Sequence, residues 1–134
     1  MTARVVVRGA LAAFMVGIGV SHLVDPGPFV AIMPAALAAH GWLLVIVSGV
    51  FEILGGIGIL VPRTRRFSGW GLAALYVAVF PANVNMALHD LPANGVVLPH
   101  WVLVARLPFQ LAFIGLALWV TAPEAAAPAG GAAT

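Results

Sequence analysis

Four apolar runs of about 20 residues constrain this chain more than any other feature; they lie near 5–23, 42–61, 69–88 and 101–120. The chain is 63% hydrophobic and 7% charged, whereas a single domain of this size buries only roughly 70% of its surface on folding. About 20 apolar residues in a helix cross about 30 Å of hydrocarbon. Because a segment in lipid must satisfy its own backbone hydrogen bonds and these runs lack the alternation of barrel strands, we expect four transmembrane helices.

Charge fixes the expected orientation of these helices. Five of the six arginines form two clusters, Arg4/Arg8 and Arg63/Arg65/Arg66, that flank apolar runs. The positive-inside rule places both clusters in the cytoplasm. The sequence therefore predicts an all-α, antiparallel bundle of four transmembrane helices with both termini cytoplasmic. We interpret the arginines as topology determinants and expect no nucleic-acid partner.

The segments outside the four runs differ in character. The first outer loop, residues 24–41, is broken by Pro26, Pro28 and Pro34 but stays apolar, which predicts a short interfacial segment lying over the bundle. Residues 1–121 are expected to form one transmembrane domain. Residues 122–134 are rich in Ala, Gly and Pro and predict a disordered tail.

Small residues spaced four apart predict close helix packing. Two such seams are present, Gly9, Ala13, Gly17 and Ser21, and Ser48, Glu52 and Gly56; a similar stripe in the third run is made by Ala74, Ala78, Ala82, Asn85 and His89. Small residues let helix backbones approach closely in lipid. The seams serve either packing within the bundle or contact with a second copy, as a homo-oligomer.

Five polar residues interrupt the apolar runs and need a structural or functional explanation. At 1.5 Å per residue, Glu52 lies roughly 15 Å and Gln110 roughly 13 Å from the outer surface, with Asn83, Asn85 and Arg106 at roughly 5 to 8 Å. A lone ionised carboxylate at such depth is costly, so Glu52 is expected to be protonated or paired. Apart from Arg8, at the start of the first run, Arg106 is the only arginine within the runs. We therefore predict a Glu52–Arg106 interaction, direct or through Gln110 or water, if their helices are neighbours.

The histidines of this chain are expected at one end of the bundle. His22, His40, His89 and His100 all lie at the outer ends of the predicted helices. Imidazoles there suit hydrogen bonding or a proton path to Glu52. No i, i+4 His pair or H-E-x-x-H motif occurs, so we predict no metal site. The chain has no Cys, which excludes thiol redox chemistry and Cys-ligated metal centres.

Three segments carry a resemblance to a known family. SGVFEILGGIGIL holds Glu52, VFPANVNMALH holds Asn83 and Asn85, and RLPFQ holds Arg106 and Gln110. Together they resemble the DoxX-like family of small four-helix bacterial membrane proteins, over nearly the whole chain except the tail. The resemblance implies a multi-pass protein of the bacterial cytoplasmic (inner) membrane. Some relatives are linked to quinone-dependent sulfur oxidation or to membrane oxidoreductase assemblies.

The leading functional hypothesis is an outward-facing polar pocket that binds a quinone or other lipophilic small molecule and serves a membrane oxidoreductase partner. Glu52 and Arg106 are the candidate catalytic residues. The candidate ligand-binding residues are Asn83, Asn85, Gln110, His22 and His89. No cofactor is evident beyond a quinone as ligand, and membrane lipid is an expected partner. The alternatives are a stand-alone isomerase, cyclase or epoxide-opening enzyme with Glu52 as general acid or base, and a purely structural membrane subunit.

Overall fold

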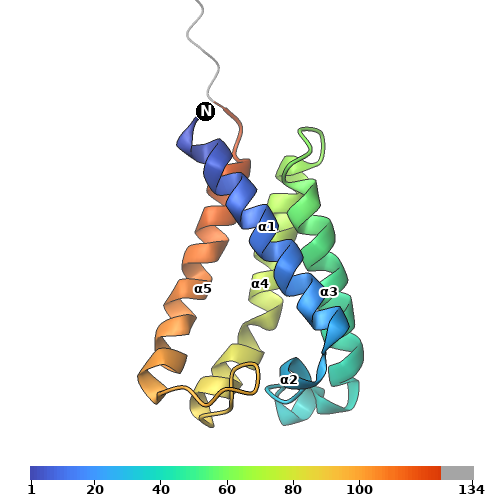
Figure 1. The fold of residues 1–134 in the computed structure, drawn as a ribbon, viewed down its shortest axis with the longest axis vertical. Coiled ribbons are helices and arrows are strands. Elements are labelled where there is room, and N and C mark those ends of the chain that lie inside the picture. The colour runs from blue at the N-terminus through green and yellow to red at the C-terminus, as the bar shows by residue number, and fades with distance from the viewer. Residues whose placement is uncertain (125–134) are drawn as a thin grey trace, which may run out of the picture.

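The computed structural model describes residues 1–124, and these residues fold mainly into helices (Figure 1). The elements in chain order are α1 (Ala3–Val24), α2 (Gly27–Val30), the 3₁₀ helix η1 (Ala35–His40), α3 (Gly41–Gly58), α4 (Arg65–Leu88) and α5 (His100–Thr121). Four helical segments are long and apolar enough to span a membrane: α1, η1 continued by α3, α4 and α5. They match the four predicted runs. Of the predicted tail, residues 125–134 lie outside the described residues.

The boundary between α3 and α4 differs from the prediction. We expected helices over 42–61 and 69–88, but α3 ends at Gly58 and α4 already begins at Arg65. The three glycines near the end of α3 weaken its last turn. The hydroxyl of Thr64 then donates to the carbonyl oxygen of Gly58 at 2.9 Å, and Arg65 Nε donates to that of Ile59 at 3.1 Å. These bonds satisfy carbonyls that the helix end leaves free.

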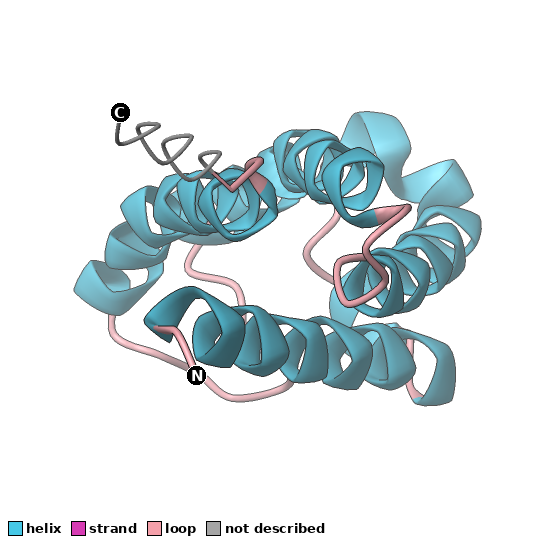
Figure 2. Cartoon of the chain, turned by 90° about the horizontal axis from the view of Figure 1, so that it is seen from above, coloured by secondary structure: helices cyan, strands magenta, loops and turns pink. Residues whose placement is uncertain are grey.

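The four long helices form an antiparallel bundle in which α1 packs along α3 and α4 packs along α5. Shorter contacts join α3 to α4 and α1 to α5. Figure 1 shows α1 crossing the front of the bundle, from the end of α5 to the far end of α3, and Figure 2 shows the helices surrounding a common centre. The end that carries Arg4, Arg8 and 63–66 is called the arginine end below. The opposite end, where all four histidines lie, is the histidine end.

Glycine allows a close approach of the backbones of α1 and α3. A Cβ on Gly49 would lie 2.8 Å from both the carbonyl oxygen of Gly19 and the Cβ of His22. Gly56 lies in the same seam, because a Cβ there would meet the carbonyl oxygen of Ala12 at 3.0 Å. The predicted seam through Ser48 and Gly56 is therefore confirmed as a buried face of α3.

The predicted seam on α1 does not pack within the bundle, and its alternative role in contact with a second copy stays a prediction. Gly9, Ala13 and Gly17 are exposed, and no atom lies within 4 Å of a Cβ built on either glycine. The buried face of α1 instead holds residues large enough to fill the centre of the bundle: Arg8, Leu11, Ala12, Met15, Gly19 and His22. On α4 the predicted stripe lies largely outward, since Ala74, Ala78 and His89 are exposed. Spacing alone did not identify which face of α1 or α4 packs.

The hydrophobic core is divided along the bundle axis. The cluster in the arginine half draws on all four long helices; its buried members are Leu11, Ala12, Met15, Ile59, Leu72, Ala117 and Val120. The cluster at the histidine end is built by α4 and α5 around Met86, Ala87 and Leu103. Ile32 of the first loop packs against this second cluster. At the histidine end, therefore, the loop fills space between the two helix pairs.

Both loops at the histidine end are ordered by local geometry. Residues 24–41 contain α2 and η1, and their location at a membrane interface stays a prediction. In the second loop, Ala93 and Val96 exchange two backbone hydrogen bonds of 2.9 Å around Asn94 and Gly95. Both turn residues have positive φ, 51° and 78°, as a type I′ turn requires, and Asn-Gly is its preferred pair.

The α1–α3 contact makes a direct prediction about stability. Replacing Gly49 with Ala should lower the free energy of unfolding by about 1–3 kcal/mol, because the added methyl overpacks against backbone that cannot easily move. Gly17→Ala is the matched control, since its methyl meets nothing and Ala favours the helix. Denaturant titration in mixed micelles, followed by circular dichroism, measures both. Equal stability of the two variants would contradict the close contact.

Candidate functional site

A buried pair of ionisable side chains lies between α1 and α3. His22 Nδ1 lies 2.5 Å from Glu52 Oε2, and the two residues are only 8% and 5% exposed. His22 belongs to the last turn of α1 and Glu52 to the middle of α3. The Gly19–Gly49 contact brings the two helices close enough for the imidazole to reach the carboxylate. A buried charge needs such a hydrogen-bonded partner.

The predicted Glu52–Arg106 interaction was wrong. Arg106 is exposed on α5, and its guanidinium contacts the sulfur of Met86 at 3.9 Å. The prediction required α3 and α5 to be neighbours, whereas α3 packs on α1 and α4. Glu52 therefore takes its partner from α1. The expectation that a buried Glu52 needs a partner is confirmed, but the partner is His22.

The surroundings of the pair include residues that sequence reasoning missed. Phe29 of α2 places its ring edge-on to the imidazole of His22, with centroids 4.0 Å apart. Ser48 lies one turn before Glu52 on the same face of α3, and its hydroxyl oxygen is buried with no hydrogen-bond partner among residues 1–124. The i, i+4 spacing of Ser48 and Glu52 was the available signal for this residue. Buried hydroxyl groups are normally hydrogen-bonded. The unpaired hydroxyl of Ser48 is therefore available to a polar group of a ligand bound beside the pair.

The pair has the chemistry of a proton-transferring site. With Nδ1 engaged by the carboxylate, Nε2 is the ring nitrogen that remains to donate to or accept from a ligand, and it makes no hydrogen bond within the described part of the chain. A carboxylate on the opposite nitrogen orients an imidazole and stabilises its protonated form. His22 can thus hold or release one proton at Nε2.

A second polar group joins α4 and α5. Asn83 Nδ2 donates to Gln110 Oε1 at 2.6 Å, and Gln110 Nε2 donates to the backbone carbonyl of Tyr76, also at 2.6 Å. Tyr76 lies five residues before Pro81, which is inside α4 and disturbs the hydrogen bonds of the preceding turn. Asn83 and Gln110 were predicted to line a ligand pocket. The structure brings them to each other as an interhelical contact, and a role in ligand binding stays a prediction.

Asn85 connects α4 to the first loop. Its side-chain nitrogen donates to the carbonyl oxygen of Ile32 at 2.9 Å. His89, one turn later and exposed, has Nδ1 3.0 Å from the carbonyl oxygen of Asn85. These two candidate ligand-binding residues thus lie beside the loop that carries Phe29. His89 is not in contact with the His22–Glu52 pair.

The four histidines share one end of the bundle, as predicted, but only His22 is buried. His100 Nδ1 lies 2.6 Å from Asp90 Oδ1 in an exposed pair. Within residues 1–124 no group of three or more His, Cys, Asp or Glu side chains has the arrangement of a metal site. The histidines are therefore not assembled around a common centre.

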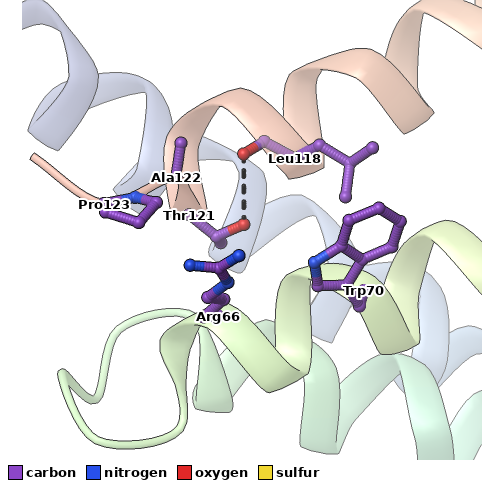
Figure 3. Close-up of a pocket in the computed structure, with 6 residues that line it drawn as sticks. All are labelled: Arg66, Trp70, Leu118, Thr121, Ala122 and Pro123. Atoms are coloured by element: carbon purple, nitrogen blue, oxygen red, sulfur yellow. Dashed lines mark hydrogen bonds between the residues drawn. The ribbon is translucent and has the colours of Figure 1, made fainter.

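Two hollows of the surface lie at the arginine end, away from the buried pair. One is lined by Arg66 and Trp70 of α4 and by the end of α5 (Figure 3). A second adjoins it and includes Arg65 and Glu124. Arg8, expected only to set topology, is buried and donates from Nε to the carbonyl oxygen of Val120 at 2.8 Å.

The fold and the buried pair define a helical-bundle protein with four segments long and apolar enough to span a membrane. The chain belongs to a family described as a domain of unknown function (DUF8561), which matches residues 11–121. The matched range contains the His22–Glu52 pair and every polar residue of α3, α4 and α5 discussed above. No curated protein matches the chain, and no solved structure does.

The identity of the partner of Glu52 can be tested by double-mutant cycles. His22→Leu and Glu52→Leu should each destabilise the protein by about 3–5 kcal/mol, because each leaves one buried polar partner unpaired. The double variant should recover part of this loss, with a coupling energy of about 0.5–3 kcal/mol. Unfolding in mixed micelles measures the cycle. The Glu52–Arg106 cycle is the control, and a larger coupling there would contradict the observed pairing.

Proposed function

We propose that this protein is a multi-pass protein of the bacterial cytoplasmic membrane that binds a quinone or similar lipophilic molecule at the His22–Glu52 pair and serves a partner oxidoreductase. The observation that carries the proposal is the burial of this pair within helices long enough to span a membrane. Ionisable groups at such positions are costly and typically mark ligand or proton sites. The resemblance to DoxX-like proteins supports the membrane and the kind of partner.

The residues around the pair fit the polar head of a quinone. A quinone presents carbonyl oxygens, which accept hydrogen bonds, on an aromatic-sized ring. The free Nε2 of His22 and the unpaired hydroxyl of Ser48 are donors of the required kind, and Phe29 supplies an aromatic neighbour. When bound, a quinone supplies two-electron chemistry coupled to protons. The role of this chain is to orient the head and to hold a proton at His22, with Glu52 stabilising the charge.

Access to the pair would pass beneath the first loop. Phe29 lies against His22, and the loop is tied to α4 by the Asn85–Ile32 hydrogen bond. One such bond contributes only about 0.5–1.5 kcal/mol, so displacing the loop is a small cost beside that of opening the core.

The same pair also supports a second candidate, a stand-alone enzyme acting on a lipophilic substrate. The specific observation is the carboxylate on His22 Nδ1, an arrangement that makes a histidine a general base or acid. Isomerisation, cyclisation and epoxide opening need only such proton transfers. Turnover of a lipophilic substrate by the purified protein without a partner would favour this candidate over an accessory role.

Ligand binding tests the proposal. Glu52→Gln and His22→Gln should weaken binding of a short-chain quinone analogue by about tenfold, the effect of losing a hydrogen bond to a charged group. His40→Gln is the matched control, because His40 is exposed at the same end. Titration of protein in detergent, by quenching of Trp fluorescence, measures affinity, and circular dichroism checks the fold. Unchanged binding in both variants, with the fold intact, would leave a structural role.

The proposed orientation can be tested because the chain has no Cys. Thr64→Cys at the arginine end and Asn94→Cys at the histidine end each introduce one exposed thiol. In intact cells a membrane-impermeant maleimide should label Asn94→Cys and leave Thr64→Cys unlabelled until the membrane is opened. The reverse pattern would invert the topology and place the His22–Glu52 pair in the cytoplasmic half.

A further inference from the structure

The five arginines at the arginine end divide into two groups. Three donate hydrogen bonds to backbone carbonyl oxygens at the ends of α3 and α5: Arg4 to Ala122, Arg8 to Val120, and Arg65 to Ile59 and Leu60. Helix ends leave such carbonyls unpaired, and cations there are favoured by the helix dipole. These three arginines therefore have a structural role. Arg63 and Arg66 make no hydrogen bond or ion pair within residues 1–124.

Arg66 differs from Arg63 because it lines a hollow. Arg66 and Trp70 are one turn apart on α4, and both border the space beside Leu118 and Thr121 of α5 (Figure 3). The hydroxyl of Thr121 is already donating, to the carbonyl oxygen of Ala117 at 2.7 Å. The guanidinium of Arg66 and the indole N–H of Trp70 remain as donors with no acceptor in the described chain. Arg63 lines neither hollow.

The hollow combines features of a membrane interface. Trp70 is 59% exposed and the neighbouring Phe67 is 83% exposed, and aromatic side chains favour the headgroup region of a bilayer. Leu118 and Pro123 supply apolar wall. Within residues 1–124, the five arginines of this end have one carboxylate side chain near them, Glu124, which lines the adjoining hollow. The local charge is thus positive, with one negative group nearby.

We infer that the Arg66–Trp70 hollow binds the phosphate of an anionic phospholipid headgroup. Arginine pairs with phosphate oxygens through two parallel N–H bonds, and Trp70 adds a third donor from the same face of the helix. A phosphodiester carries one negative charge, which suits one free guanidinium beside Glu124 better than a dianionic phosphate does. The apolar wall then receives the upper part of the acyl chains. This inference requires the proposed membrane orientation but not the proposed quinone site.

The experiment compares lipid retention in matched variants. The protein is placed in nanodiscs of phosphatidylcholine with increasing phosphatidylglycerol, and native mass spectrometry gives the preference for bound phosphatidylglycerol. Arg66→Gln should lower this preference by about tenfold or more, as expected for a hydrogen-bonded charge pair. Arg63→Gln should lower it by about fivefold or less, the general effect of one arginine near an anionic surface. Trp70→Phe, which keeps the ring and removes the N–H, should give an intermediate loss.

Three outcomes would overturn the inference. Equal losses in Arg66→Gln and Arg63→Gln would mean general attraction with no site. An unchanged preference in both variants would mean that neither arginine binds lipid. Displacement of phosphatidylglycerol by glycerol 3-phosphate at a similar concentration would assign the hollow to a soluble phosphate compound. Quinone-analogue titration of Arg66→Gln, which should match wild type, and the thiol-labelling pattern separate these failures from failure of the proposed function.

Discussion

The close contact between α1 and α3 is the interaction on which the rest of the arrangement depends. Gly19 and Gly49 carry no Cβ, so the two backbones approach until His22 reaches Glu52. Either residue alone would leave a polar group buried among apolar helices, which costs several kcal/mol. Glycine packing and the ion pair therefore support each other. Small residues provide the proximity, and the polar contact fixes the register of one helix against the other.

Because α1 is tilted across the bundle, the packing of the helices differs between the arginine end and the histidine end. α1 touches the end of α5 at the arginine end and α3 at the histidine end (Figure 1). Core packing of all four long helices is thus concentrated in the arginine half. At the histidine end the helix pairs are connected through the first loop, by Ile32 and Asn85. Since local opening costs least where few apolar contacts are lost, this end is the part of the bundle that opens at the lower free-energy cost.

The four helices could be predicted from the sequence, and so could the need of Glu52 for a polar partner or a proton. Both depend on local composition, through hydropathy and the cost of desolvation. The sequence was insufficient for the partner of Glu52. Depth along a helix placed Arg106 within reach, but which helices are neighbours depends on packing of the whole bundle. His22 was considered as a ligand-binding residue near the surface, yet the tilt of α1 buries it. The exposed stripe from Gly9 to Gly17 illustrates the same limit. Residue spacing shows which residues share one face of a helix, but not what that face packs against.

The exclusive use of arginine follows from what the arginine end must do. The chain contains six arginines and no lysine. A guanidinium offers several donors in a fixed plane, so it can bridge helix-end carbonyls as Arg65 does, with two donors on neighbouring residues. An ammonium group is more strongly hydrated, so moving it from water to such a position costs more desolvation free energy. Arg8 shows the extreme, a cation almost fully buried and held by the carbonyl oxygen of Val120. The arginine end is thus held by side-chain hydrogen bonds to helix-end carbonyls in addition to the core cluster.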